Sequence, residues 1–170
     1  MSGAGPVPGV RRLGPEDWET YRAIRLEMLR DSPDAFWTSY DEAAGLDEAT
    51  WRERLTGGGT LLAELGGEPV GSVTTWAGPP GEDEPGLTNL VAMYVSPSAR
   101  RRGVGAALLR AALLEARAQG RHVVHLEVAS SNHGARSLYE RTGFRATGVT
   151  RPHPRRPELH EAQLECRLGG

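Results

Sequence analysis

The stretch around residues 94–109 combines positive charge and backbone freedom at one predicted turn. An apolar strand ends, three arginines follow at residues 100–102, and two glycines, Gly103 and Gly105, open a helix. Glycine permits positive φ angles and lets the backbone approach a ligand closely. The first amide groups of a helix add partial positive charge at the same place. Together these features predict a concave anion site that accommodates a diphosphate, with whole charges from the arginines.

Two other interpretations of this turn need to be weighed. A plain strand-to-helix turn with surface arginines is the simpler one. A dinucleotide-binding fingerprint is the other, with Glu127 about twenty residues further on. The third glycine position of that fingerprint holds Leu108, which is too large for close contact between helix and strand. The motif also begins at residue 103 of 170 and leaves no room for two βαβαβ halves, so we reject the fingerprint.

Glu127 lies on a predicted strand that alternates apolar and polar residues. Val124, Leu126 and Val128 share one face, which leaves His125 and Glu127 on the other. A carboxylate on such a strand is costly to bury unless it is paired or functional. Glu127 is therefore either a proton acceptor or the partner of an arginine, and His125 is expected to be structural.

Asn132 and Tyr139 are seven residues apart on a short predicted helix. Nearly two helical turns separate them, so they share one face and lie about 10 Å apart along the axis. Asn132 suits a helix cap as well as a ligand contact, and Tyr139 suits the core as well as a site.

The elements that must position these residues follow from apolar spacing and turn residues. We expect an α/β (α+β) fold with a single mixed, mostly antiparallel sheet of about six to seven strands, flanked by about four helices on its two faces. The expected helices cover residues 15–31, 47–55, 104–119 and 133–141. The expected strands cover residues 60–65, 70–76, 90–95, 123–128, 144–149 and 160–168. The Gly- and Pro-rich residues 1–10 are expected to be disordered, and residues 11–170 to form one domain.

The composition is that of a globular protein, with 38% apolar and 25% charged residues. Twenty basic against 22 acidic groups argue against a general nucleic-acid binder. The sequence lacks the run of about 18 apolar residues that a membrane span needs. Its single cysteine, Cys166, excludes an internal disulfide and a multi-cysteine zinc site, so we expect no metal and a cytoplasmic location. All basic residues are arginine, which excludes a lysine nucleophile or Schiff base.

Charge is placed unevenly along the chain. Residues 1–99 hold 7 arginines and 16 acidic residues, whereas residues 100–170 hold 13 arginines and 6 acidic residues. The second half therefore suits an anionic ligand and the first half a cationic one. Scattered surface charge is the plainer alternative.

The sequence resembles the GNAT superfamily of acyl-CoA-dependent N-acetyltransferases. The resemblance rests on Val95-x-Pro97-x-x-Arg100-x-x-Gly103-x-Gly105, then His125-Leu-Glu-Val-x-x-x-Asn132, then Leu138-Tyr139-x-x-x-Gly143-Phe144. It runs over residues 61–168 in element order and is sharpest over residues 90–145. It implies that residues 11–170 form an N-acetyltransferase domain that uses acetyl-CoA as co-substrate.

The resemblance also implies a role for each part of the motif. The diphosphate of acetyl-CoA would lie on residues 101–106, and the pantothenate arm would pair with the backbone where the central strands splay apart. Tyr139 would protonate the departing thiolate. Glu127 would accept the amine proton through a water, since the strand over residues 90–95 has no carboxylate. An ordered water chain is the alternative base. The cofactor-binding residues would be Met93, Tyr94, Val95, Arg100, Arg101, Arg102, Gly103, Val104, Gly105, Ala106, Asn132 and Tyr139.

The acceptor is expected to be a small-molecule or peptide amine. Family members bind it between the first two helices and the loop that joins the last two strands, here residues 151–157. Phe36 and Tyr40 lie among acidic residues in the first region, which suits a cationic amine. Arg151 and His153 in the loop suit a carboxylate instead, so the two regions point to different acceptors.

The implied activity is transfer of an acetyl group to a primary amine by direct attack on the thioester. A non-catalytic acyl-CoA-binding regulatory module is an alternative, as is the same fold with a longer acyl-CoA. A homodimer is compatible with the sequence, which does not determine the oligomeric state.

Overall fold

Seven strands form a single sheet in a computed structural model that describes residues 5–169. The strands are β1 (Gly9–Arg12), β2 (Thr60–Leu65), β3 (Glu68–Trp76), β4 (Leu87–Val95), β5 (Val123–Ala129), β6 (Arg145–Pro152) and β7 (His160–Arg167). Their order in the sheet is β1-β2-β3-β4-β5-β7-β6. Neighbouring strands pair antiparallel except β4 and β5, which are parallel. The predicted mixed, mostly antiparallel sheet is confirmed.

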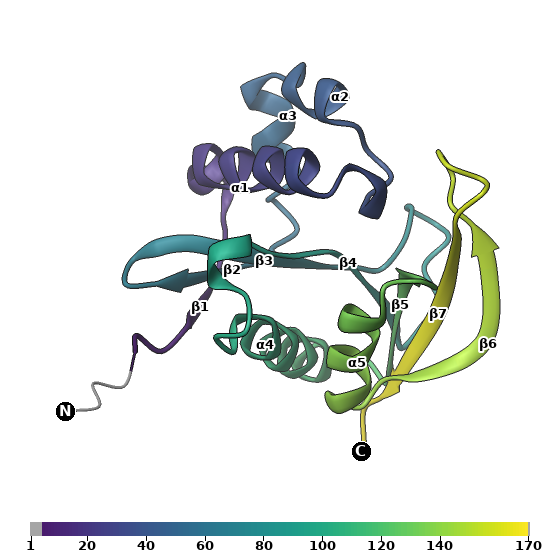
Figure 1. Cartoon of the computed structure of the whole chain (residues 1–170). Coiled ribbons are helices and arrows are strands. Elements are labelled where there is room, and N and C mark those ends of the chain that lie inside the picture. Colours follow the sequence, from purple (N-terminus) through teal and green to yellow (C-terminus); the bar gives the residue numbers. More distant parts are fainter. Residues whose placement is uncertain (1–4, 170) are drawn as a thin grey trace.

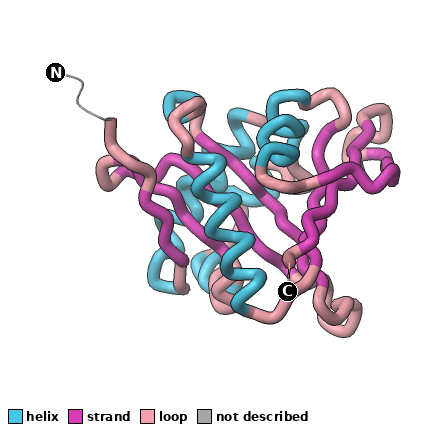
Figure 2. Tube along the Cα trace, turned by 90° about the horizontal axis from the view of Figure 1, so that it is seen from below, coloured by secondary structure: helices cyan, strands magenta, loops and turns pink. Residues whose placement is uncertain are grey.

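Within residues 5–169, five α-helices cover the two faces of this sheet. They are α1 (Trp18–Asp31), α2 (Tyr40–Ala44), α3 (Glu48–Glu53), α4 (Val104–Ala118) and α5 (His133–Arg141). Helices α1, α2 and α3 lie on one face and α4 and α5 on the other (Figure 1). Viewed from below, α4 crosses the strands (Figure 2). Over residues 5–169, no helix has both the length and the apolar character needed to span a membrane.

Helix α2 is the one that sequence periodicity does not predict, because it has only five residues. The hydroxyl of Ser39 caps it by accepting a hydrogen bond from the amide of Glu42, and the Glu42 carboxylate accepts one from the amide of Ser39. The cap on α3 is similar, with Asp47 accepting from the amide of Thr50 at 2.9 Å. These short helices thus depend on side-chain caps and on packing against α1.

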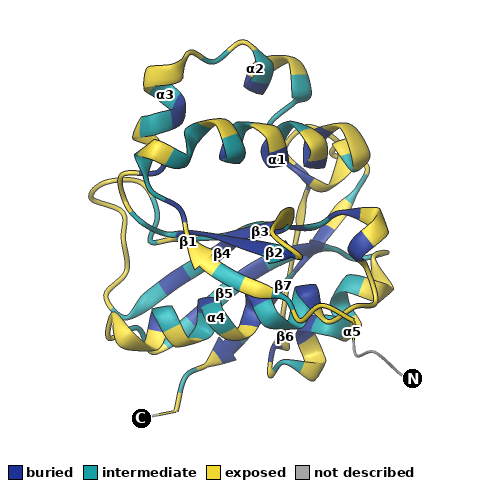
Figure 3. Ribbon diagram, turned by 90° about the vertical axis from the view of Figure 1, so that its left-hand side faces the viewer, coloured by how far each residue is buried: buried dark blue, intermediate teal, exposed yellow. Residues whose placement is uncertain are grey.

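Two apolar cores lie on either side of the sheet, between the helical layers (Figure 3). The core under α4 and α5 includes Leu108, Leu109, Val124, Leu126, Phe144 and Leu164. The core under α1, α2 and α3 includes Ile24, Met28, Phe36, Trp51, Leu62 and Tyr94. The apolar face of β5 therefore packs towards α4 and α5, and its polar face is turned to the side of α1.

The N-terminal segment departs from its prediction. Gly9 and Val10, expected in a disordered terminus, lie in β1 and pair with Glu64 and Ala63 of β2. Residues 1–4 of that predicted disordered stretch lie outside the described residues. Strand β1 has only four residues at the edge of the sheet, too few for apolar alternation to reveal it.

The centre of the sheet opens between β4 and β5. The two strands pair only from Leu87 with Val123 to Asn89 with His125. Beyond that point β4 carries a bulge, where its register with β3 shifts and Ala92 has a φ of 53°. A bulge bends the strand that contains it, so β4 turns away from β5. In the described residues, the facing backbone edges of residues 90–95 and 126–129 therefore have no strand partner.

Candidate active site

The predicted anion turn connects β4 to α4. Arg101 and Gly103 adopt left-handed backbone conformations, with φ angles of 60° and 79°. Gly103 is also the N-cap of α4 and has no side chain to bind the first amide groups of the helix. A left-handed residue followed by a helical one forms a nest of amide N–H groups that accepts an anion. The turn thus has the backbone geometry of a diphosphate site.

The three arginines of this turn have different surroundings. Arg101 and Arg102 are exposed, and no acidic residue within residues 5–169 forms an ion pair with either. Arg100 folds back, with its Nη2 2.8 Å from Asp31 Oδ2 and its Nε donating to the carbonyl of Val95 at 3.0 Å. Arg101 and Arg102 can therefore reach an anion, whereas Arg100 ties the turn to the end of α1.

The two glycines of the turn serve different purposes. A Cβ at Gly103 would meet nothing within 4 Å, so this position borders open space. A Cβ at Gly105 would lie 2.8 Å from Leu138 Cδ2 and 3.5 Å from Met93 Cε. Gly105 therefore allows α4 to pack closely against β4 and α5, and Gly103 is the glycine that keeps the amide nest open.

Met93, Tyr94 and Val95 form the end of β4 beside the opening in the sheet. Tyr94 and Val95 pair with Ser72 and Gly71 of β3 along their other edge. The Tyr94 ring lies in the core under α1, where burial raises the pKa of its hydroxyl to about 12. The Tyr94 side chain is thus turned away from the turn, and its backbone lies at the edge that faces the opening.

Helix α5 carries Asn132 at its start and Tyr139 in its last turns. Asn132 Oδ1 accepts a hydrogen bond from the amide of Ala135 at 3.1 Å, so this residue is a helix cap. The Tyr139 ring is 7% exposed and contacts Phe144 edge to face, with ring centroids 5.8 Å apart. Burial raises the pKa of the Tyr139 hydroxyl far above its ordinary value, so the group stays protonated and has a proton to donate.

Glu127 lies on the polar face of β5 with a side chain that is 22% exposed. Burial raises the pKa of its carboxyl, the nearby Arg151 opposes that shift, Glu161 adds to it and His125 opposes it. The Nη1 of Arg151 is 3.8 Å from Glu127 Oε1. The Nε2 of His125 forms a 2.9 Å hydrogen bond with Glu165 Oε2, a contact that suits a structural residue.

Glu161, which sequence reasoning missed, shares a face of the sheet with Glu127, and Trp37 from the expected acceptor region binds it. Glu161 on β7 is only 5% exposed, and its Oε1 accepts a hydrogen bond from Trp37 Nε1 at 3.0 Å. Glu161 pairs with Ala129, two residues along β5 from Glu127, so the two carboxylates share one face of the sheet. Apolar and polar residues alternate along β7, a signal that could have placed Glu161 on this face once the strand pairing was known.

The expected acceptor residues are not brought together as a group. Phe36 is 9% exposed and belongs to the core under α1, with the guanidinium of Arg25 5.7 Å from its ring. Tyr40 binds Arg30 through a 2.8 Å hydrogen bond. His153 is 2% exposed, and its Nδ1 accepts from two amides of its own loop. Of the four residues expected to bind the acceptor, only Arg151 lies beside Glu127.

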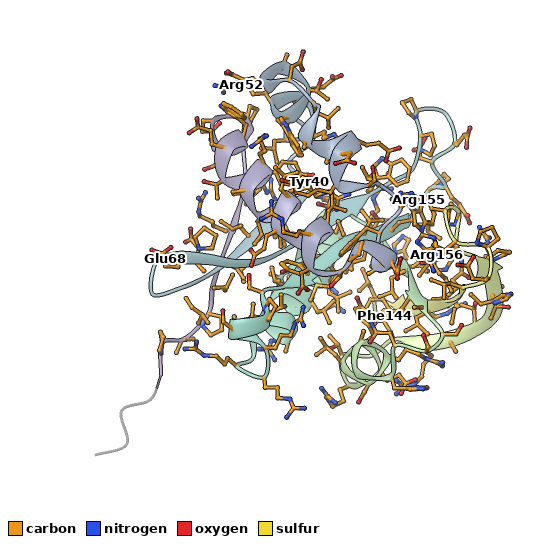
Figure 4. All side chains as sticks on the ribbon, turned by 45° about the horizontal axis from the view of Figure 1, so that its top comes forward. Tyr40, Arg52, Glu68, Phe144, Arg155 and Arg156 are labelled. Atoms are coloured by element: carbon orange, nitrogen blue, oxygen red, sulfur yellow. The ribbon has the colours of Figure 1, made fainter. Side chains whose placement is uncertain are left out.

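Two contacts join the β6–β7 hairpin to the segment between α1 and α2. Arg156 Nη1 lies 2.6 Å from Asp34 Oδ1, and Trp37 binds Glu161 as described above. Figure 4 labels Arg156 in the loop of this hairpin and Tyr40 at the start of α2. The polar face of β5 therefore lies beneath a bridge between the N-terminal helices and the C-terminal hairpin.

Comparison with known proteins shows the family of this chain. The sequence profile described as the acetyltransferase (GNAT) family matches residues 25–144. The chain belongs to the GNAT family. Sequence relatives of this GNAT chain include an uncharacterised N-acetyltransferase of Methanocaldococcus jannaschii, 32% identical over 104 residues, covering 59% of this chain and 45% of the relative. The mycothiol acetyltransferase of Geodermatophilus obscurus is 31% identical over 156 residues, covering 85% of this chain and 49% of the relative. The chain thus spans about half the length of these relatives.

Solved structures share the GNAT fold along the whole chain. A GNAT acetyltransferase from Streptococcus pneumoniae has a TM-score of 0.78 at 22% identity and covers 96% of this chain and 100% of its own. A Salmonella typhimurium structure that holds its cofactor acetyl-CoA has a TM-score of 0.76 at 21% identity. The match covers 96% of this chain and 95% of the Salmonella chain. A ribosomal-protein-alanine N-acetyltransferase from Brucella melitensis has a TM-score of 0.76 at 24% identity. The match covers 94% of this chain and 99% of the Brucella chain. At these identities the likeness concerns the fold alone.

Proposed function

We propose that this GNAT protein transfers an acetyl group from acetyl-CoA to a primary amine by direct attack of the amine on the thioester. The observation that carries the proposal is the amide nest at Gly103 next to an opening in the sheet. Strand β5 adds Glu127, a carboxylate with a raised pKa, and helix α5 adds Tyr139, which is buried and protonated. Membership of the acetyltransferase family supports the same conclusion.

The residues of the turn and of β4 fit acetyl-CoA, which supplies an activated acetyl group. The amides of residues 103–106 and the side chains of Arg101 and Arg102 would hold its diphosphate. The unpaired edge of β4 at residues 93–95 would bind the pantetheine amides as a strand binds its neighbour. Arg100 would act only by fixing the turn, because its guanidinium is already bound to Asp31.

Glu127 would remove the proton from the amine. An alkylammonium with a pKa near 10.4 is almost fully protonated at pH 7, and its deprotonation there costs about 4–5 kcal/mol. Burial raises the pKa of Glu127 and makes it a stronger base, while Arg151 limits that shift and so keeps the carboxylate ionised. Because the ionised form is the active one, transfer should rise with pH as Glu127 loses its proton.

Tyr139 would act at the other end of the reaction. The thiolate that departs carries negative charge that a hydrogen-bond donor stabilises. The raised pKa of Tyr139 ensures that its hydroxyl still has a proton to donate at the alkaline end of the working range.

Thiol release from acetyl-CoA over a panel of primary amines tests the proposal, with mass spectrometry of the acetylated product. We expect release that depends on both the amine and the protein. Binding of acetyl-CoA without turnover of any amine would instead support a non-catalytic acyl-CoA-binding module. Faster release from a longer acyl-CoA would support the same fold with a different acyl donor.

Glu127→Gln should reduce kcat/KM for the amine by about 100-fold at pH 7 and by less than about 10-fold at pH 9.5. The difference arises because free amine is scarce at pH 7, whereas about one-tenth of it is already free at pH 9.5, so turnover depends less on a base. The measurement is the pH profile of thiol release for the wild type and the variant. An equal loss at both pH values would show that Glu127 does not accept the proton.

A further inference from the structure

The Glu161 carboxylate has an unusual environment for a charged group. Its side chain is 5% exposed, yet within residues 5–169 its only hydrogen bond is the one from Trp37, and no arginine forms an ion pair with it. A buried carboxylate normally has ionic or multiple hydrogen-bonding partners. Its second oxygen, Oε2, has neither, so the site offers an acceptor position for a cation that the chain itself does not fill.

The position of that oxygen relative to Glu127 matters. Both carboxylates lie on the face of β5 and β7 beneath the bridge between the α1–α2 segment and the hairpin, and Glu161 is close enough to help raise the pKa of Glu127. Within residues 5–169, the arginine that pairs with Glu127 is Arg151, whose Nη1 lies 3.8 Å from Glu127 Oε1 and whose side chain is 63% exposed. Two carboxylates against one exposed guanidinium leave this face with an excess of negative charge.

The basic residues of the hairpin loop do not compensate for it. Arg156 is bound to Asp34 and Glu158. His153 is buried with its Nδ1 bound to two amides of its own loop. Arg155 makes only the smallest contribution to the lowered pKa of the exposed Glu42 on α2, which is lowered chiefly by hydrogen bonds with Ser39. Two basic residues of the loop that seemed suited to a carboxylate, His153 and Arg156, thus already have partners within the chain.

We infer that Glu161 determines acceptor specificity: with Glu127 it forms a two-carboxylate site for the ammonium group of an amine that has no carboxylate beside it. This inference rests on the proposed acetyl transfer and narrows its acceptor class. Trp37 fixes the Glu161 side chain through one oxygen and leaves the other for the ammonium. The exposed Arg151 side chain moves away from Glu127 when the ammonium group binds, and Glu127 then accepts a proton from the ammonium. Free amino acids are disfavoured, because their α-carboxylate would face both glutamates.

Matched amine pairs that differ only in a carboxylate provide the test: tryptamine and tryptophan, tyramine and tyrosine, phenethylamine and phenylalanine. Each is assayed for acetyl transfer and, separately, for binding to the coenzyme A complex by calorimetry. The variant is Glu161→Gln, whose amide oxygen can still accept from Trp37, so that the charge is lost and the geometry retained. The matched control is Glu165→Gln on the same strand, which loses a carboxylate paired with His125 instead.

For the wild type we expect kcat/KM to be at least about 100-fold higher for at least one decarboxylated amine than for its amino acid. Glu161→Gln should raise the KM for that amine about 10-fold or more and change kcat less than about threefold. The KM for acetyl-CoA should be unchanged, and the ratio of kcat/KM between the amine and its amino acid should become smaller. Glu165→Gln should leave the KM for that amine, kcat, the KM for acetyl-CoA and the preference for the amine over its amino acid nearly unchanged.

Three results would overturn the inference: equal kcat/KM within every pair, equal effects of the two glutamine variants, or no binding of any amine to the coenzyme A complex. Binding that prefers the decarboxylated amines and weakens in Glu161→Gln, but with no thiol release, would uphold the ammonium site and reject acetyl transfer.

Discussion

Replacement of Tyr139 by Phe should lower kcat for acetyl transfer by about 100-fold or more, with little change in affinity for acetyl-CoA. The substitution removes one hydroxyl and keeps the ring that packs against Phe144. Within residues 5–169 that hydroxyl forms no hydrogen bond, so its loss should leave the free energy of unfolding nearly unchanged. A large effect on turnover with no effect on stability is the pattern expected of a proton donor.

Tyr21→Phe is the matched control for this substitution. Tyr21 is also buried, at 8% exposed, and contacts Trp51 edge to face with centroids 5.5 Å apart, but it lies in the other core. Thiol release and urea unfolding of both variants separate the two effects. If Tyr139→Phe and Tyr21→Phe retain the same kcat, Tyr139 is a core residue and some other group protonates the thiolate.

Gly103→Val should weaken acetyl-CoA binding by about 10-fold or more, whereas Gly120→Val should not change it. The two glycines close opposite ends of α4, have φ angles of 79° and 75°, and have nothing within 4 Å of an added Cβ. A side chain at either position is strained in the same way, by about 1–2 kcal/mol. Only at Gly103 would it also fill the amide nest.

Calorimetric titration with acetyl-CoA and urea unfolding of both variants provide the comparison. Equal losses of stability with a binding defect in Gly103→Val alone would support the diphosphate site. Equal acetyl-CoA affinities in the two variants would show that the amide nest at Gly103 does not bind acetyl-CoA.

Most of the fold that positions the site follows from local sequence signals. The strands and helices over residues 60–168 have clear apolar periods and turn residues, and the turn at Gly103 has glycine and arginine at a characteristic spacing. The short elements β1 and α2 do not, because four or five residues are too few for a period, and they form through pairing with β2 and a cap at Ser39. Tertiary contacts decide such elements.

The acceptor side was harder to predict for a physical reason. Phe36 and Trp37 are adjacent aromatic residues, and only packing decides that the first enters the core and the second reaches Glu161 across 124 positions of sequence. Charge counting by halves of the chain was equally limited, because both carboxylates beneath the bridge, Glu127 and Glu161, come from the predominantly basic half. Such a site depends on strand pairing and long-range contacts that composition does not contain.

A crystal structure of the protein with coenzyme A tests the proposed site most directly. We predict diphosphate oxygens within hydrogen-bonding distance of amides in residues 103–106 and a pantetheine chain running along the open edge of β4. The thiol should lie between the Tyr139 hydroxyl and the Glu127 side of the sheet. Coenzyme A bound elsewhere, or a turn at Gly103 closed by side chains with the ligand excluded, would contradict the mechanism proposed for this protein.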